Sequence, residues 1–302
     1  MRKLITYIIL FFSFFLYSQE PLFTLVDNSK TGIDFSNDLV DTKEHSIFLY
    51  ANYYGGAGVG IGDFDNDGLE DIFFAANLVD DKIYKNLGNF QFEDKTKMSG
   101  IINNGSWSTG VTVADVNNDG LLDIYVSCEL YDDLPYLRTN KLYINEGDFK
   151  FKDISETAGI QGDDRWYSGV SVIDINNDGF LDLYIAVGGE NKPNNNVLYI
   201  NNQDNTFTEK AKAYGIDDDG YSMHSTFFDY DNDGDLDLYV ANYPPTSFTA
   251  PVDYYRYMLD HHEPRDSDHL YRNEGDHFVD VTKISGISNF GLSLGVVASD
   301  FN

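Results

Sequence analysis

Cysteine, proline and positive charge are scarce in this 302-residue chain. The single cysteine, Cys128, excludes an internal disulfide and a cysteine-built zinc site, and its apolar neighbours predict a buried strand thiol. Only 20 lysines and arginines oppose 50 aspartates and glutamates, a formal net charge of −30. Such a surface repels phosphates, so we expect no nucleic acid partner. The 22 Tyr and 22 Phe favour a packed, strand-rich fold over an acidic disordered chain.

Long hydrophobic runs are also lacking, except at the N-terminus. Arg2 and Lys3 precede a mostly apolar run over residues 4–15, which is shorter than a membrane span requires. This order is typical of a signal peptide, here residues 1–18 with cleavage after Ser18. The mature domain, 19–302, is then expected to be secreted, periplasmic or held at the cell surface, with no stable membrane span after signal removal.

An acidic loop recurs through the chain, with oxygen-bearing side chains at positions 1, 3, 5 and 9 and glycine at position 6. Successive first positions lie 52, 59 and 55 residues apart, and a fifth copy begins at Asp300, where the sequence stops in mid-repeat. Recurrence at a fixed period is the signature of a repeat architecture. The four complete loops contain Asp63, Asp65, Asp67 and Asp71; Asp115, Asn117, Asp119 and Asp123; Asp174, Asn176, Asp178 and Asp182; and Asp229, Asp231, Asp233 and Asp237.

Two further motifs keep step with the acidic loop. One is Leu/Ile-Tyr-x-Asn, at 83–86, 142–145, 198–201 and 270–273. The other is a Phe eight residues before a Gly-Ile pair, beginning at Phe92, Phe151, Phe207 and Phe278. Phe23 stands nine residues before Gly32, so we expect residues 21–35 to supply the last strand of a preceding unit.

Each unit has the pattern of four short strands. In the second unit these are expected at 110–114, 123–128, 141–145 and 149–154, where β-branched and aromatic residues alternate with Gly, Asn and Asp turns. No sustained helical period follows the signal segment. Four antiparallel strands in about 50 residues describe a propeller blade. The predicted fold is therefore all-β, a β-propeller of four-stranded blades with an incomplete ring.

The acidic loops have the ligand chemistry of a hard cation. Alternate oxygens turn toward one point, glycine permits a positive-φ turn, and oxygen-only ligation selects calcium. Without a cation, fourteen carboxylates in four short loops would repel one another, although Asp and Asn are also common in plain polar turns. An EF-hand needs Glu at position 12, which here is Phe74, Val126, Ile185 and Val240. We expect one Ca²⁺ per complete loop, four in all, in a structural role.

The segment 58–71 and its three later copies resemble FG-GAP/VCBS repeats, which occur in integrin α-chain propellers. The Leu-Tyr-x-Asn and Phe to Gly-Ile elements make the chain most similar to the cartilage acidic protein, or ASPIC/UnbV-associated, subgroup. The resemblance covers residues 21–302, and these residues are not expected to include an ASPIC/UnbV domain. It implies a calcium-bound propeller acting in adhesion or ligand binding.

Two other stretches are considered for chemistry. The glycine series over 55–62 is followed by an acidic loop and not by a helix, so close packing of an inner strand explains it better than a nucleotide site. An insert at 244–268 contains Tyr254, Tyr255, Tyr257, His261, His262, Glu263, Asp266 and Asp268. It is expected to be a solvated loop that contributes to a ligand face.

Two functions from different classes follow from these patterns. The first is an exported binding or adhesion module, not an enzyme, whose partner is an extracellular protein or glycan. The alternative is a polysaccharide-active enzyme on a propeller scaffold, for which only the region of His261, Glu263 and Asp266 offers acid-base groups.

Overall fold

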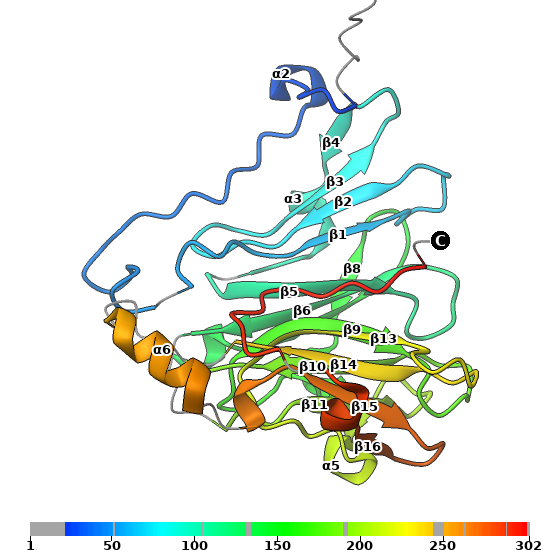
Figure 1. Ribbon diagram of the computed structural model, residues 1–302. Coiled ribbons are helices and arrows are strands. Elements are labelled where there is room, and N and C mark those ends of the chain that lie inside the picture. Colours follow the sequence, from blue (N-terminus) through cyan, green and yellow to red (C-terminus); the bar gives the residue numbers. More distant parts are fainter. Residues whose placement is uncertain are drawn as a thin grey trace, which may run out of the picture.

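The structure is a computed structural model that describes residues 22–300, apart from 51, 104, 131–133, 190–192, 244–250, 262–263 and 288. The predicted signal peptide and residues 301–302 of the fifth acidic loop lie outside this part. The described chain is all-β and forms four four-stranded antiparallel sheets, one per repeat, arranged as a fan (Figure 1). These are the blades of a propeller whose ring is incomplete, as the sequence predicts.

In each blade the strands follow one another in chain order and neighbours pair antiparallel. We number the blades 1 to 4 along the chain. Their strands are β1 Val59–Gly62, β2 Asp71–Phe74, β3 Lys82–Asn86 and β4 Phe92–Asp94; β5 Trp107–Ala114, β6 Asp123–Glu129, β7 Lys141–Asn145 and β8 Phe151–Asp153; β9 Tyr167–Ile173, β10 Asp182–Val187, β11 Val197–Asn201 and β12 Phe207–Glu209; β13 Ser222–Phe228, β14 Asp237–Asn242, β15 His269–Asn273 and β16 Phe278–Asp280.

The strand prediction for the second unit agrees with the structure to within three residues at each end. Its one notable difference is at Phe149, which was expected to begin the fourth strand. Asp148 and Phe149 instead adopt positive φ angles of 52° and 58°, so they form the tight turn between β7 and β8. Two successive positive-φ residues match the twist of an antiparallel hairpin.

The hydrophobic core lies between the blades and not within one of them. Ile124 and Val126 of β6 pack toward blade 1, whereas Tyr125 between them packs toward blade 3. Successive strand residues point to opposite faces. Because both faces of blade 2 are covered, every residue of β6 is buried, including the free Cys128. Cys128 is thus the buried strand thiol that the sequence predicts, and burial raises the pKa of its thiol.

Glycines allow the first strands of the blades to approach one another closely. The strands β1, β5, β9 and β13 are successive neighbours. A Cβ atom added at Gly60 would lie 2.7 Å from Val113 Cγ2, and one added at Gly110 would lie 2.2 Å from the carbonyl oxygen of Ser168. Three glycines of the series over 55–62, namely Gly58, Gly60 and Gly62, therefore pack against blade 2, as expected of an inner strand.

A one-turn helix follows the fourth strand of every blade and ends at the glycine of the Gly-Ile pair. These turns are α3 Thr96–Ser99, α4 Ser155–Ala158, α5 Ala211–Tyr214 and α7 Thr282–Ser285. Each glycine has a φ between 74° and 81°, the left-handed conformation that closes a helix. The insert contains a longer helix, α6 Val252–His261, where only a loop was expected. At ten residues it is too short to show a sustained period.

The N-terminal segment repeats part of this end-of-blade unit. Here α2 Asn28–Thr31 ends at Gly32, whose added Cβ would lie 2.6 Å from the carbonyl oxygen of Phe92. Gly100 stands in the same relation to Phe151, at 2.7 Å. Residues 22–34 form no strand, however, so the predicted last strand of a preceding blade stays a prediction.

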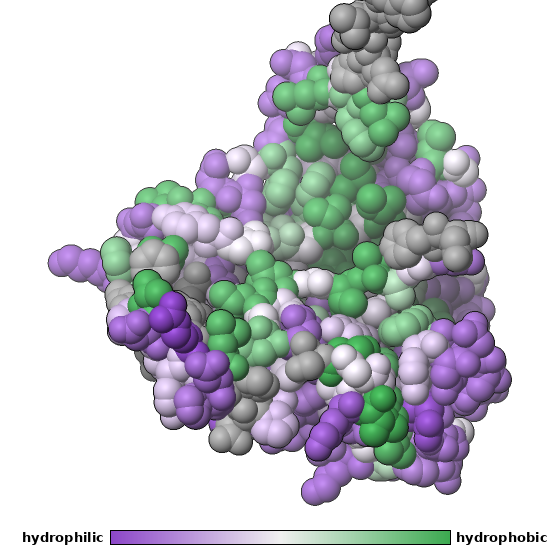
Figure 2. All heavy atoms as spheres, viewed as in Figure 1, coloured by the Kyte–Doolittle hydropathy of each residue, from purple (hydrophilic) through white to green (hydrophobic). Residues whose placement is uncertain are grey.

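One face of blade 1 has no neighbouring blade in the described chain. Val59 and Ile61 of β1 are 52% and 61% exposed there, whereas the residues that alternate with them are buried. Apolar side chains gather over this sheet and in the hollow beside it (Figure 2). Within the described ranges, no helix has the length and hydrophobicity to cross a bilayer.

Candidate metal centre

Each acidic loop connects the first and second strands of its blade, at one end of the sheet. We call these turns loop 1 (63–71), loop 2 (115–123), loop 3 (174–182) and loop 4 (229–237). In loop 1, Asp63 at position 1 accepts hydrogen bonds from the backbone amides of Asp67 at 3.0 Å and Gly68 at 2.7 Å. The other three loops repeat both bonds. The backbone of each loop therefore folds around the carboxylate of the aspartate at position 1.

The aspartate at position 9 is the first residue of the second strand and is buried in all four loops. In loop 2, Asp123 accepts from the backbone amide of Val116 at 3.0 Å and from that of Asn145 at 2.8 Å. Burial raises the pKa of Asp123 to about 7, against these hydrogen bonds, which lower it. The same balance raises the pKa of Asp71 to about 6. A cation beside these carboxylates favours their charged form.

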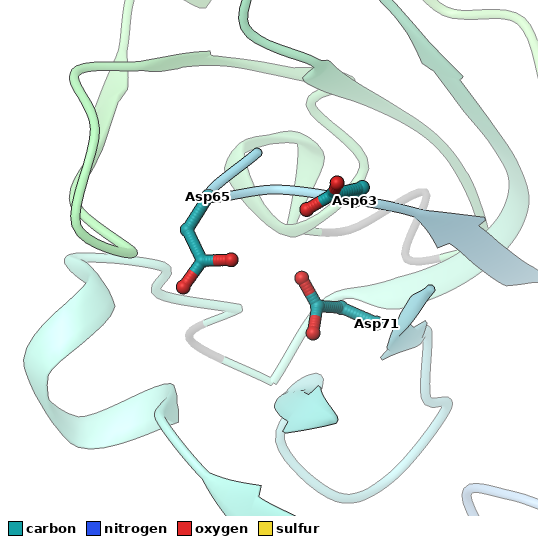
Figure 3. A group of neighbouring side chains, drawn as sticks. All are labelled: Asp63, Asp65 and Asp71. Carbon is teal, nitrogen blue, oxygen red and sulfur yellow. The ribbon is translucent and has the colours of Figure 1, made fainter. Parts of the chain in front are cut away.

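In loop 1 three carboxylates converge on one point. Asp63, Asp65 and Asp71 each offer an oxygen, and these atoms lie within 4.8 Å of one another (Figure 3). Asp65 Oδ1 is buried and has no hydrogen-bond partner. An unpaired buried carboxylate oxygen is costly, so this arrangement fits a bound cation. Asp229, Asp231 and Asp233 of loop 4 form a second such group.

Loops 2 and 3 are arranged differently. Among the His, Cys, Asp and Glu side chains of the described residues, only the groups in loops 1 and 4 bring three ligand atoms so close. Position 3 is an asparagine in loops 2 and 3, and the amide nitrogen of Asn117 donates to Asp119 Oδ2 at 2.9 Å. Asn176 and Asp178 make the same contact at 3.0 Å. The sixteen predicted residues thus lie in four equivalent turns, but three carboxylates converge in only two of them.

A positive side chain also enters loop 1. Lys85 of β3 forms ion pairs with Asp65 Oδ2 and, at 2.7 Å, with Asp67 Oδ2. Apart from this lysine, the side chains of loop 1 that could bind a metal offer only oxygen atoms, which a hard cation such as calcium prefers.

No role was predicted for positions 2 and 4 of the loop, although the residue type at each position recurs in all four copies. Position 2 is apolar or aromatic in every copy, and Phe64, Val116 and Ile175 are buried in the cores between blades. Position 4 is always asparagine and has a positive φ. Asn66 there donates to the carbonyl oxygen of Gly120 in the next loop at 3.0 Å, and Asn118 donates to that of Gly179 at 2.8 Å. Loop 1 is therefore hydrogen-bonded to loop 2, and loop 2 to loop 3.

In the insert, His261 and Asp268 make separate contacts. The His261 ring stacks on Tyr257 of the same helix, with the ring centroids 4.4 Å apart. Asp268 instead belongs to the repeat, because it accepts from the backbone amide of Asn242 at 2.7 Å, just as Asp81 accepts from Ala76 at 2.8 Å. His262 and Glu263 lie outside the described residues.

Comparisons with known proteins agree with the repeats of the chain. A family model described as FG-GAP-like repeat matches residues 63–126, 134–185 and 183–240. Integrin alpha-8 of Gallus gallus is 27% identical over 214 residues, which cover 65% of this chain and 20% of the relative. Cartilage acidic protein 1 of Xenopus tropicalis is 24% identical over 224 residues, which cover 72% of this chain and 34% of the relative.

A solved sialidase of Trypanosoma rangeli, in complex with sialic acid, covers 74% of this chain and 37% of its own at 12% identity. Its TM-score of 0.37 is too low to bear on fold or activity. The chain spans about a fifth to a third of the length of the two curated relatives above. Because the matched ranges cover more than half of the sequence and each contains strands of two successive blades, this chain belongs to the FG-GAP-like repeat family.

Proposed function

We propose that the chain is an exported, calcium-stabilised propeller that serves as a binding or adhesion module. The observation that carries the calcium assignment is the convergence of Asp63, Asp65 and Asp71, together with the unpaired, buried Oδ1 atom of Asp65. Water cannot reach that oxygen freely, and the protein supplies it with no donor. A divalent ion at this point would satisfy it and offset the repulsion among the three carboxylates.

Calcium in these loops would stabilise the assembly of blades as well as single turns. Loop 1 is hydrogen-bonded to loop 2, and loop 2 to loop 3, through the position-4 asparagine, and position 2 of these three loops is buried in the cores between blades. The one cysteine is buried and unpaired. A secreted domain without disulfides needs another cross-link, and an ion held between two strands supplies one.

The proposed partner is an extracellular protein or glycan, and the proposed location is secreted, periplasmic or at the cell surface. Integrin alpha-8 and cartilage acidic protein 1 share the repeats, and the acidic surface favours partners that are not polyanions. The residues over 1–18 support export by their pattern. A propeller presents loops on a rigid scaffold, which suits recognition.

The test is a thermal melt of the chain in EDTA and after return of calcium. At a free calcium concentration of 100 times the Kd, one site adds about 2.7 kcal/mol to the free energy of unfolding. Calcium should therefore raise the melting temperature by several degrees. Magnesium at the same concentration should restore less of the melting temperature, because it binds fewer ligands and demands a nearly ideal octahedral geometry.

The control for the loop assignment is a matched pair of substitutions. D63N removes a carboxylate of the converging group, whereas E70Q changes an exposed acid of the same loop. The calcium-dependent rise should shrink in D63N and stay in E70Q. A wild-type melting temperature that ignores calcium would refute the calcium role. Glycan and protein arrays probed with calcium-loaded protein then identify the partner class.

A further inference from the structure

We propose that Lys85 is a tethered cation of loop 1, which neutralises the loop when no metal is bound and competes with calcium for it. Loop 1 then binds calcium more weakly than it would with an uncharged residue at this position. The inference rests on the proposed calcium role of the loops and concerns how one of them differs from its copies.

The contacts of Lys85 place its charge inside the loop. Its Nζ pairs with one oxygen of Asp65 and, at 2.7 Å, with one oxygen of Asp67. The side chains of Lys85 and Asp65 are only 20% and 18% exposed, so solvent screens this pair less than a surface pair. Nζ also lies 5.6 Å from the ring centroid of Phe149 in blade 2, a favourable cation–π position.

The other three blades have different residues at the position equivalent to Lys85. Lys85 stands between the tyrosine and the asparagine of the Leu/Ile-Tyr-x-Asn element, where blades 2 and 3 have Ile144 and Ile200. Blade 4 has Arg272, whose guanidinium bonds to Glu274 in the adjoining turn, with Nε 2.8 Å from Oε1. Among these four positions, Lys85 alone is ion-paired with the loop aspartates in the described structure.

The electrostatics make Lys85 a competitor and not a co-ligand. An ammonium and a divalent ion attracted to the same carboxylate lie a few ångströms apart and repel each other. Lys85 contacts Oδ2 of Asp65 and leaves Oδ1 unpaired, so it satisfies the loop only in part. A lysine has a long flexible stem and can withdraw its ammonium to water. Calcium uptake at loop 1 must therefore break both ion pairs, which lowers the affinity.

The experiment is a calcium titration of the full chain by calorimetry, in wild type, K85M and K82M. K85M keeps the apolar stem and removes the charge. K82M is the matched control, because Lys82 is on the same strand and pairs with Asp94 at 2.6 Å, away from the loop. We expect K85M to raise the affinity of one site at least tenfold and K82M to leave every site unchanged. In EDTA, K85M should melt at a lower temperature than K82M.

A double variant assigns the gain to loop 1. D65N combined with K85M should lose the added affinity, and a gain that survives in it would overturn the inference. Equal affinities in K85M and K82M would also overturn it, and would leave the calcium role intact if wild type still binds. If wild type binds no calcium, one site appearing in K85M supports the competition. Absence of binding in both would refute the proposed function and the inference together.

Discussion

Asn145 Nδ2 donates a hydrogen bond of 2.8 Å to the backbone carbonyl of Phe64, 81 residues earlier in the chain. This bond connects the third strand of blade 2 to loop 1 of blade 1. Asn201 makes the same connection to Val116, at 2.7 Å. In blades 2 and 3 the asparagine of the Leu/Ile-Tyr-x-Asn motif therefore links neighbouring blades, which gives a physical reason for the motif and the acidic loop to keep step.

Replacing Asn145 by alanine should lower the free energy of unfolding by about 1–3 kcal/mol, because the carbonyl of Phe64 loses a buried donor. Asn86 is the matched control, since its Nδ2 donates within its own blade, to Glu70 at 2.8 Å. N86A should cost less. Urea unfolding curves for the two variants check this, and equal losses would contradict the link between blades.

Replacing Asp123 by alanine should be destabilising even in EDTA. The backbone amides of Val116 and Asn145 would lose their acceptor in a buried site, at a cost of roughly 2–5 kcal/mol. Asp119 of the same loop is exposed, so D119A should cost under about 1 kcal/mol in EDTA. Chemical denaturation in EDTA separates this structural role from metal binding. A small loss of unfolding free energy in D123A would mean that the two buried hydrogen bonds to Asp123 contribute little without the ion.

Replacing Gly110 by alanine should disrupt the packing of β5 against β9. The new methyl carbon would lie 2.2 Å from the carbonyl oxygen of Ser168, so the strands must separate, at a cost of about 2–4 kcal/mol. Gly295 has open space around its Cβ position, so G295A should stay within about 0.5 kcal/mol of wild type. Melting temperatures of the two variants measure the difference, and an unchanged G110A would show that the blades tolerate a wider spacing.

Glu129 should make stability depend on pH. The residue is 5% exposed, and desolvation raises the pKa of its carboxyl from 4.5 to about 7, although the hydrogen bond from the Tyr50 hydroxyl lowers it. The folded protein holds this proton more tightly than the unfolded chain. The contribution of Glu129 is therefore fully present below pH 4.5, and it is lost as the pH rises to about 7.

The variant E129Q keeps a neutral acceptor for Tyr50 and removes this titration. We compare the free energy of unfolding of E129Q with that of wild type at each pH. This difference should favour E129Q by about 2–4 kcal/mol more at pH 8 than at pH 4.5. Asp81, whose pKa burial raises to about 7, titrates in the same direction in both proteins, so their difference isolates Glu129. Unfolding free energies across this pH range measure it. Parallel curves for E129Q and wild type would contradict the assignment, and the exposed E156Q serves as the control.

The strands, their order and the acidic loops could be predicted from the sequence because their signals are local. The apolar run in 123–128 and the Gly and Asn turns around it depend on residues a few positions apart. Phe149 was misplaced because a tight turn can place an aromatic residue at positive φ. The helix α6 was missed because ten residues show no clear period.

The sequence by itself therefore determined a four-stranded unit, its repetition and the four turns in which oxygen side chains gather. The tertiary structure alone decided that Asp63, Asp65 and Asp71 converge while Asn117 turns its amide onto Asp119. It also placed Lys85 in loop 1 and Asn145 on Phe64. Backbone preference acts between neighbours in the chain and fixes the turns, but not where the side chains within a turn point. The contacts of Lys85 and Asn145 join residues 18 to 81 positions apart and exist only once strands and blades pack in register.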